Sequence, residues 1–318
     1  MGSFLVTGAA GFIGSNLCVE LQRQGHWVRG VDAFTDYYAR PLKEANLEWA
    51  RGGGRLEVVE TDLSDADLET LFDGMDGVFH LAAQPGVRAS WGRELEIYLR
   101  DNVFVSHRVF QAAAARSIRV VYASSSSIYG DAESYPTHEQ IEPRPISPYG
   151  ITKLACEHLA RSFAKAEGLD AVGLRYFTVF GPGQRPDMAF TRLIATAIDA
   201  GTFELFGDGD QSRDFTYVSD AVAATIGSME RGTTGAVYNV GGGAETTVNE
   251  VIGMLEDLIG LPLVVQRGAR VAGDVRRTAS DTARISNDLG WKPQHTLRNG
   301  LADQVEWMRT SHRVPDHA

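Results

Sequence analysis

A tyrosine and a lysine four residues apart, Tyr149 and Lys153, form the pair with the clearest chemical potential in this sequence. On a helix this spacing places both side chains on one face. A neighbouring ammonium stabilises a phenolate, so such a pair can remove a proton from a substrate hydroxyl. The same spacing arises by chance in many helices, usually as a half-buried tyrosine beside a solvated lysine. The pair alone therefore does not establish catalysis.

Four consecutive serines, residues 124–127, lie upstream of this pair and directly follow the apolar run 120–122. The apolar run predicts a buried strand, which would deliver the hydroxyls to its carboxyl end. A hydroxyl donor and a phenolate that face one substrate hydroxyl suit the oxidation of its carbon, with a nicotinamide accepting the hydride. Serine runs at strand ends are also common turn formers, so the hydroxyls need a second signal beside them.

That signal is a glycine pattern near the N-terminus, Gly8, Gly11 and Gly14, between a predicted strand at residues 3–7 and an amphipathic helix. The glycines let the backbone approach a pyrophosphate at the helix N-terminus, where free N–H groups attract anions. A second predicted strand, residues 27–31, ends at Asp32, where a carboxylate accepts the adenosine ribose hydroxyls. Because this carboxylate would repel a 2′-phosphate, the pattern favours NAD over NADP.

Composition sets the remaining limits. The chain has 318 residues, 43% of them hydrophobic, and a formal net charge of −11, which disfavours nucleic acid as a partner. No apolar run approaches the length of a membrane span, and no basic segment at the N-terminus indicates a signal peptide. Cys18 and Cys156 are expected to be buried reduced thiols, which fits a cytoplasmic protein. No metal site is predicted.

Strand and helix patterns alternate through the first half of the chain, which predicts an α/β fold with a doubly wound parallel sheet of the Rossmann type. From Thr178 onward the rhythm breaks at several glycine and proline clusters. We expect an NAD-binding domain at residues 1–177, with residues 215–240 returning to it. Residues 178–214 and 241–318 are expected to form a smaller α/β substrate-binding lobe.

The G-x-x-G-x-x-G spacing, together with Tyr149 and Lys153, resembles the short-chain dehydrogenase/reductase superfamily. The chain length and the sequence Gly-Phe-Ile-Gly at residues 11–14 resemble its extended branch, the nucleotide-sugar epimerases and dehydratases. The resemblance extends from residue 4 to about residue 307. The resemblance implies Ser125 as the triad hydroxyl, with the serine register ambiguous by one, Tyr149 as acid/base and Lys153 as its partner. It also implies an NAD site made of Gly8, Gly11, Phe12, Ile13, Gly14, Asp32, Asp62, Leu63, Leu81, Ala82, Ala83, Asn102, Tyr149, Lys153 and Tyr176.

Three segments, residues 36–43, 83–88 and 175–189, resemble the UDP-glucuronate 4-epimerase subgroup, and Thr178 stands where UDP-glucose epimerases usually have Asn. The broader family often has an Arg at the position of Val271, so Arg270 and Arg276 are the candidates for its role. The substrate contacts that the resemblance implies are Pro85, Arg88, Ser126, Ser127, Thr178, Arg185, Arg192, Phe206, Arg213 and Arg276.

The resemblance thus implies reversible C4 epimerisation of a UDP-hexuronate by transient oxidation to a 4-keto sugar. Dehydratases carry an Asp-Glu pair after the triad hydroxyl, whereas this chain has Ser126 and Ser127, so elimination is disfavoured. The alternatives are a UDP-glucose 4-epimerase, a dehydratase or decarboxylase, and an NAD-sensing protein without activity. The implied partners are a UDP-sugar and a second copy of the chain, which family members bind through two helices, here near residues 102–115 and 149–166.

Overall fold

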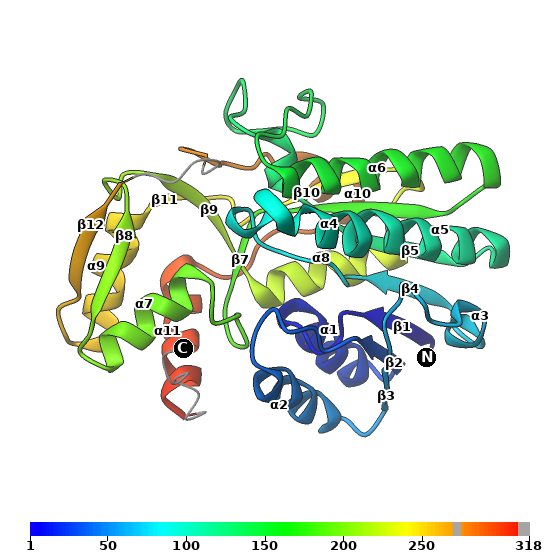
Figure 1. Cartoon of the computed structure of the whole chain (residues 1–318), viewed down its shortest axis with the longest axis horizontal. Helices are drawn as coiled ribbons and strands as arrows, with labels where there is room; N and C mark the ends of the chain where they lie inside the picture. The colour runs from blue at the N-terminus through cyan, green and yellow to red at the C-terminus, as the bar shows by residue number, and fades with distance from the viewer. Residues whose placement is uncertain (270–274, 311–318) are drawn as a thin grey trace.

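The computed structural model describes residues 1–269 and 275–310, and its centre is a seven-stranded sheet in which every neighbouring pair of strands is parallel (Figure 1). The strand order is β10-β6-β5-β4-β1-β2-β3. This order reverses direction between β1 and β4, and open α/β sheets bind ligands at the carboxyl ends of the strands beside such a point. The strands are β1 (Ser3–Thr7), β2 (Trp27–Asp32), β3 (Leu56–Glu60), β4 (Gly77–His80), β5 (Arg119–Ser125), β6 (Ala171–Tyr176) and β10 (Val237–Val240).

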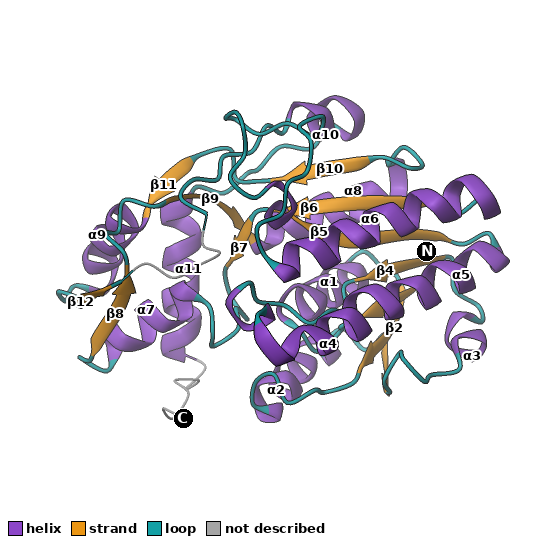
Figure 2. Ribbon diagram, turned by 45° about the horizontal axis from the view of Figure 1, so that its top comes forward, coloured by secondary structure: helices purple, strands orange, loops and turns teal. Residues whose placement is uncertain are grey.

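Helices cover both faces of this sheet, as Figure 2 shows. One layer holds α1 (Phe12–Arg23), α2 (Arg40–Arg51) and α8 (Val218–Arg231), and the other holds α3 (Leu68–Phe72), α5 (Val105–Arg116) and α6 (Pro148–Glu167). Strands buried on both faces need continuous apolar runs rather than alternation. In β5, Val121 packs into the core of the first layer, while Val120 and Tyr122 pack into the core of the second. The predicted doubly wound parallel sheet is confirmed.

The rest of the chain forms smaller sheets beside the large one. A three-stranded sheet has the order β11-β9-β7, and a parallel pair joins β8 to β12. Helices α7, α9 and α11 contact one another around these strands (Figure 1). The elements are β7 (Thr178–Phe180), α7 (Ala189–Ile198), β8 (Thr202–Phe206), β9 (Ser212–Tyr217), β11 (Glu245–Thr247), α9 (Val248–Ile259), β12 (Val264–Gly268) and α11 (Leu297–Thr310). Helix α10 (Ala283–Leu289) packs instead on β10 of the large sheet and on α8.

The segment 215–240 differs in part from the prediction that it returns to the large domain. Its helix α8 and strand β10 do belong to the large sheet and its covering layer. Residues 215–217, however, continue β9, which pairs with β7 and β11. Strand β7 begins only two residues after the end of β6 but belongs to the three-stranded sheet, where β9 pairs with it in parallel. The division of the whole chain into two domains remains a prediction. Among the described residues, no helix is both long and apolar enough to cross a membrane.

A buried ion pair holds strand β6 against helix α6. Arg175 donates from Nε to one Glu157 carboxylate oxygen at 2.9 Å and from Nη2 to the other at 2.7 Å. The two side chains are only 5% and 8% exposed. Ser124 at the end of β5 donates to the same carboxylate at 2.5 Å, and Arg175 Nη1 donates to Tyr129 Oη at 2.7 Å. Because each buried charge has its partners, the network fixes α6 relative to the serine run.

We predict that Arg175→Met lowers the free energy of unfolding by about 3–5 kcal/mol, because it leaves the Glu157 carboxylate buried without its counter-charge. Urea denaturation measures the change. The matched control is Arg298→Met, which removes an exposed pair with Asp257 and should cost less than about 1 kcal/mol. Equal losses in both variants would contradict a stabilising role for the buried pair.

Candidate active site

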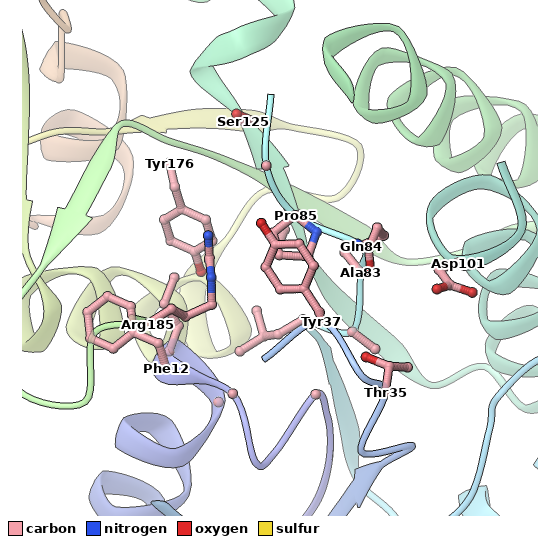
Figure 3. A pocket seen from close by; sticks show the side chains of 18 of the residues that line it. Phe12, Thr35, Tyr37, Ala83, Gln84, Pro85, Asp101, Ser125, Tyr176 and Arg185 are labelled. Atoms are coloured by element: carbon pink, nitrogen blue, oxygen red, sulfur yellow. The ribbon is translucent and has the colours of Figure 1, made fainter. Parts of the chain in front are cut away.

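A cavity of about 410 Å³ lies at the carboxyl ends of β1, β2, β4 and β5, where the change in strand order places it (Figure 3). Its wall combines segments far apart in the sequence, from the glycine pattern to the loop after β7. Most of the predicted site residues line it: Gly8, Gly11, Phe12, Ile13, Gly14, Asp32, Asp62, Leu63, Leu81, Ala82, Ala83, Pro85, Ser125, Ser126, Ser127, Tyr149, Lys153, Tyr176, Thr178 and Arg185.

The glycine pattern forms a cradle that a side chain would fill. Gly8 has a φ of +72°, and a Cβ there would lie 2.9 Å from the backbone nitrogen of Ala82. A Cβ on Gly14 would lie 2.0 Å from the Gly8 carbonyl oxygen. Helix α1 starts directly after Gly11 and has no side chain capping its N-terminus. Its first N–H groups are therefore suited to a pyrophosphate.

Asp32 is held in a fixed orientation at the rim of this cradle. Its carboxylate accepts hydrogen bonds from the backbone N–H of Ala10 at 3.0 Å and of Phe34 at 2.9 Å. A carboxylate so fixed can still accept from ribose hydroxyls, because each oxygen has more than one acceptor site. The glycine cradle, the helix N-terminus and Asp32 together fit a dinucleotide with an unphosphorylated adenosine ribose.

The Tyr149–Lys153 pair lies at the start of α6. Ser147 caps this helix by accepting the Gly150 N–H at 3.1 Å, and Pro148 occupies the first helical position, where a missing N–H costs nothing. Lys153 is 4% exposed and donates to the carbonyl oxygen of Ala123 at 3.0 Å, and its Nζ lies 5.9 Å from the centroid of the Tyr149 ring. The helix cap and the β5 carbonyl thus place phenol and ammonium on the same wall.

All four serines, residues 124–127, line the cavity together with Tyr149. The Ser124 hydroxyl already donates to Glu157, while Ser125 Oγ accepts the N–H of Ser127 at 3.1 Å. The geometry therefore favours a hydroxyl after Ser124, and the assignment to Ser125 stays a prediction.

Asn102 does not line the cavity but lies behind its wall. It sits in a π-helical turn, Leu99–Phe104, that joins α4 (Leu95–Tyr98) to α5, a feature often found at functional sites. Its Oδ1 accepts the Gln84 N–H at 2.7 Å, and its Nδ2 donates to the Gln84 carbonyl at 3.2 Å and to Thr152 Oγ1 at 3.0 Å. Asn102 thus ties the loop after β4 to helix α6, rather than offering its side chain to a cofactor.

His80 and the two cysteines are packed residues. His80 Nδ1 lies 2.8 Å from Thr7 Oγ1 and its Nε2 lies 3.1 Å from Ser106 Oγ, and burial lowers its pKa to about 3. A neutral, doubly hydrogen-bonded imidazole is a structural group. Cys18 and Cys156 are buried and unpaired, which confirms that prediction. The described residues contain no cluster of three side chains suited to a metal ion.

Five predicted substrate residues lie outside the cavity wall. Arg88 stacks over the ring of Phe206, with its Cζ 4.7 Å from the centroid, so the structure brings these two together from different parts of the chain. Arg192 stacks over Phe203. Arg213 donates to the carbonyl of Ser212 at 2.8 Å and to that of Arg276, which is exposed. Arg270 and the neighbouring stretch at 273–274 lie outside the described residues.

Sequence reasoning missed several cavity residues, among them Thr35, Tyr37, Tyr38, Lys43, Gln84 and Asp101. Lys43 is 5% exposed, donates to the Thr35 carbonyl at 2.5 Å and stacks over Tyr38. Burial lowers the pKa of Lys43. For Tyr37, Tyr38 and Lys43 a signal was present, because residues 36–43 were singled out as a matching stretch, but no side chain in it was assigned a role. Thr35 and Asp101 lie outside the segments that were singled out.

Comparison with known proteins agrees with this site. The model of the NAD dependent epimerase/dehydratase family matches residues 4–241. An uncharacterised UDP-glucose epimerase of Bacillus subtilis, YtcB, is 39% identical, with 96% of this chain and 97% of the relative covered. The structure of UDP-glucuronic acid 4-epimerase from Bacillus cereus, in complex with UDP-glucuronic acid and NAD, has a TM-score of 0.94 at 36% identity, covering 97% of this chain and 99% of that one.

A third similar protein, MoeE5, is 43% identical, with 98% of this chain and 100% of that chain covered and a TM-score of 0.89. It has been solved in complex with NAD and UDP-glucuronic acid, and also with NAD and UDP-glucose.

The fold and the site define a dinucleotide-dependent enzyme of the extended short-chain dehydrogenase/reductase class. Within that class, the chain belongs to the NAD-dependent epimerase/dehydratase family. Membership of this family confirms the prediction of NAD as cofactor.

We predict that denatured wild-type protein releases NAD and no NADP, identified by chromatography of the supernatant. Asp32→Ser should weaken the preference for NAD over NADP by about ten-fold or more, because it removes a negative charge that would face the 2′-phosphate. Asp36→Ser, an exposed carboxylate in the same loop, is the matched control and should leave the preference unchanged. Activity that requires NADP in the wild type would show the assignment of Asp32 to be wrong.

Proposed function

We propose that this protein interconverts the two C4 epimers of a UDP-hexuronate, UDP-glucuronate and UDP-galacturonate. The observation that carries the proposal is one cavity that joins the dinucleotide cradle to Tyr149, Lys153, Thr178 and Arg185. A buried guanidinium is a natural partner for a sugar carboxylate, since Arg binds carboxylates through paired charged hydrogen bonds. Two similar proteins have been solved with UDP-glucuronic acid bound, which supports the same substrate class here.

In the proposed reaction, the Tyr149 phenolate removes the proton from the 4-hydroxyl, and Lys153 stabilises that negative charge. Ser125 donates a hydrogen bond to the same oxygen as it becomes a carbonyl. NAD, held by the glycine cradle and Asp32, would supply the hydride acceptor for C4. The flat 4-keto sugar turns over between the two transfers, so that its other face receives the hydride and Tyr149 returns the proton. No net redox change results, so the cofactor can stay bound.

Arg185 is placed to meet an anionic sugar. Its side chain is 19% exposed, and its pKa is raised: burial disfavours the charged form, but the hydrogen bonds and charge of Asp187 outweigh it, with smaller contributions from Tyr37 and Tyr149. The guanidinium therefore stays charged within electrostatic range of the proposed base. Ser126 and Ser127 supply hydroxyls and no carboxylate in the wall after Ser125, which favours epimerisation over dehydration.

For the uridine diphosphate we propose contacts from Arg88, Phe206, Arg213 and Arg276, with Arg192 nearby. The stacking of Arg88 on Phe206 supports this, because a planar pair of this kind can extend to a base. The division into an NAD-binding domain and a sugar-binding lobe, as given above, is part of the same proposal.

A UDP-glucose 4-epimerase is the second candidate, favoured by the name of the similar B. subtilis protein and by the UDP-glucose complex of MoeE5. A neutral sugar would leave Arg185 without an anionic partner in the substrate. A ratio of kcat/KM for UDP-glucuronate over UDP-glucose well above one supports the first proposal, and the reverse ratio supports the second. The intact Tyr149–Lys153 pair argues against a sensing protein without activity.

We also propose a homodimer in the cytoplasm. The helix pair expected at a dimer interface carries exposed apolar side chains, since Leu95, Leu99 and Phe104 on the α4–α5 side and Ile151 on α6 are 38–55% exposed. Apolar groups gathered on one surface indicate an interaction site. The free, buried cysteines suit a reducing compartment.

We predict that Tyr149→Phe lowers kcat for UDP-glucuronate by about 10²–10⁴-fold, because the variant lacks the group that transfers the proton. UDP binding, measured by calorimetry, should change little, since only one hydroxyl is lost. Tyr135→Phe, a hydroxyl that bonds the Arg277 carbonyl, is the control. Near-normal turnover of the Tyr149 variant would refute the proposed base.

A second prediction concerns the intermediate, because a 4-keto hexuronate is a β-keto acid that can lose carbon dioxide. Thr178 and Arg185 are expected to hold the carboxylate away from the reactive orientation through hydrogen bonds of about 1.5–3 kcal/mol for a charged pair. Thr178→Ala and Arg185→Ala should therefore raise the share of UDP-4-keto-pentose relative to the epimer, measured by NMR. Slower turnover with an unchanged product ratio would contradict this role.

A third prediction tests the dimer. Phe104→Glu with Ile151→Glu should convert a dimer into a monomer in light-scattering measurements, because two buried charges would face their own copies across the two-fold axis. Val264→Glu, an exposed apolar position on β12, is the control and should leave the mass unchanged. A wild-type monomer at micromolar concentration would overturn the proposed dimer.

A further inference from the structure

The loop after β7 carries Asp187 as well as Arg185, and the two side chains form an ion pair. Arg185 donates from Nε to Asp187 Oδ1 at 2.9 Å and from Nη2 to Asp187 Oδ2 at 3.0 Å. Two parallel hydrogen bonds fix the plane of a guanidinium, whereas a single one lets it turn. Asp187 uses one edge of the guanidinium and leaves Nη1, with its two N–H donors, outside this pair.

Tyr37 contacts the same pair from another segment of the cavity wall. It lies in the loop after β2, 150 residues away in the sequence, and its hydroxyl donates to Asp187 Oδ2 at 3.1 Å. The Arg185 Cζ lies 5.6 Å from the centroid of the Tyr37 ring. Figure 3 shows both Tyr37 and Arg185 among the side chains that line the pocket. Burial, followed by the charge of Asp187, raises the pKa of Tyr37 to about 12, so the hydroxyl remains a donor at neutral pH.

A third loop makes room for this contact. Gly86, after β4, has a φ of +97°, and a Cβ there would lie 2.6 Å from the Tyr37 hydroxyl. The backbone on both sides is fixed, because Tyr98 donates to the carbonyl oxygens of Pro85 at 2.7 Å and Gly86 at 2.8 Å. The loops after β2, β4 and β7 therefore meet at the Arg185–Asp187 pair. Because Gly86 has no side chain, there is room for the Tyr37 hydroxyl.

We infer that Asp187, held by Tyr37, is a positioning residue that aims Arg185 at the carboxylate of the substrate and thereby decides between epimerisation and decarboxylation. The inference rests on the proposed function. Asp187 sets the plane of the guanidinium, Tyr37 sets the orientation of Asp187, and the Nη1 end remains for the sugar carboxylate. The carboxylate is then held in one orientation. In that orientation the carbon–carbon bond to the carboxylate is not aligned with the π orbital of the ketone, so the 4-keto intermediate does not lose carbon dioxide.

The pairing also balances charge. An isolated guanidinium would hold an anionic sugar tightly in the ground state, and binding that is equal in ground and transition states gives no acceleration. With Asp187 in place the pair is neutral overall, so Arg185 orients the carboxylate without the full attraction of an uncompensated cation. Loss of Asp187 should therefore lower KM for UDP-glucuronate while it degrades the orientation of the sugar.

The test is product analysis of Asp187→Asn, which keeps the size and one acceptor oxygen but removes the charge and the second strong acceptor. The share of UDP-4-keto-pentose relative to epimer should rise by about ten-fold or more, the change expected from losing a charged hydrogen bond. Tyr37→Phe should shift the ratio in the same direction by a smaller factor. Turnover of UDP-glucose, which has no carboxylate, should change by less than about three-fold in both variants.

A double mutant separates positioning from a direct role. In an Arg185→Ala background, Asp187→Asn should have no further effect on the product ratio, since it acts through a side chain that is no longer there. The matched control is Asp257→Asn, which removes one carboxylate of an exposed Asp–Arg pair on α9 and should leave ratio and rate unchanged. Thermal melting of each variant checks that it is folded. If Asp187→Asn is unstable, the product ratio of Tyr37→Phe is measured instead.

The outcomes are distinct. An Asp187→Asn enzyme that epimerises UDP-glucuronate with the wild-type product ratio overturns the inference alone. Equal losses of rate with UDP-glucuronate and UDP-glucose would show a structural role and also overturn it. Absence of any reaction between the wild-type enzyme and UDP-glucuronate overturns the proposed function as well.

Discussion

The hydrogen bond from Lys153 to the carbonyl of Ala123 is the interaction on which the geometry of the site depends most. It joins the second turn of α6 to the end of β5 and so sets the position of Tyr149 relative to the serine hydroxyls. Behind it, the buried pair of Glu157 and Arg175 joins the same helix to β6 and also engages Ser124. The contacts of α6 with β5 and β6 therefore hold Tyr149 and Lys153 in the positions that acid–base catalysis requires.

The cavity must also bind anions although the chain as a whole is negatively charged. The proposed function requires a chain with a net charge of −11 to hold a dinucleotide and an anionic nucleotide sugar, both of which carry phosphates. The cavity itself provides positive charge, because Lys43, Lys153 and Arg185 line its wall, as do the residues at the start of α1 with their N–H groups. These cations are partnered by carbonyls or by Asp187 rather than left free, which keeps each one in a defined direction. Placement of a few charges, rather than overall charge, makes the site fit anions.

Much of this arrangement could be predicted because it is encoded locally. A strand, a glycine pattern and a helix follow one another in the chain, so the cradle at Gly8 and Gly14 needs only short-range reasoning. Parallel order then brings the carboxyl ends of β1, β2, β4 and β5 together, and with them Asp32 and the serines. The helix cap at Ser147 similarly fixes where Tyr149 must lie.

The features that escaped prediction depend on long-range contacts. Nothing near Tyr37 indicates that its hydroxyl meets Asp187, nor does the sequence around Arg88 indicate its stacking on Phe206. The pairing of β9 with β7 was missed because an alternating apolar pattern shows that a strand exists without showing which edge it joins. The hydrogen bonds of Asn102 to the Gln84 backbone were not predicted either, because a π-helical turn leaves no mark in the periodicity of the sequence.

The central claim is that one bound cofactor removes and returns the same hydride at C4. The most direct measurement is the conversion of UDP-glucuronate that carries deuterium at C4, in ordinary water and without added NAD, followed by mass spectrometry and NMR of the product. The account predicts UDP-galacturonate that keeps its deuterium at C4 in nearly every molecule. Replacement of that deuterium by hydrogen from solvent would contradict it, because the C4 hydrogen would then leave as a proton instead of a hydride.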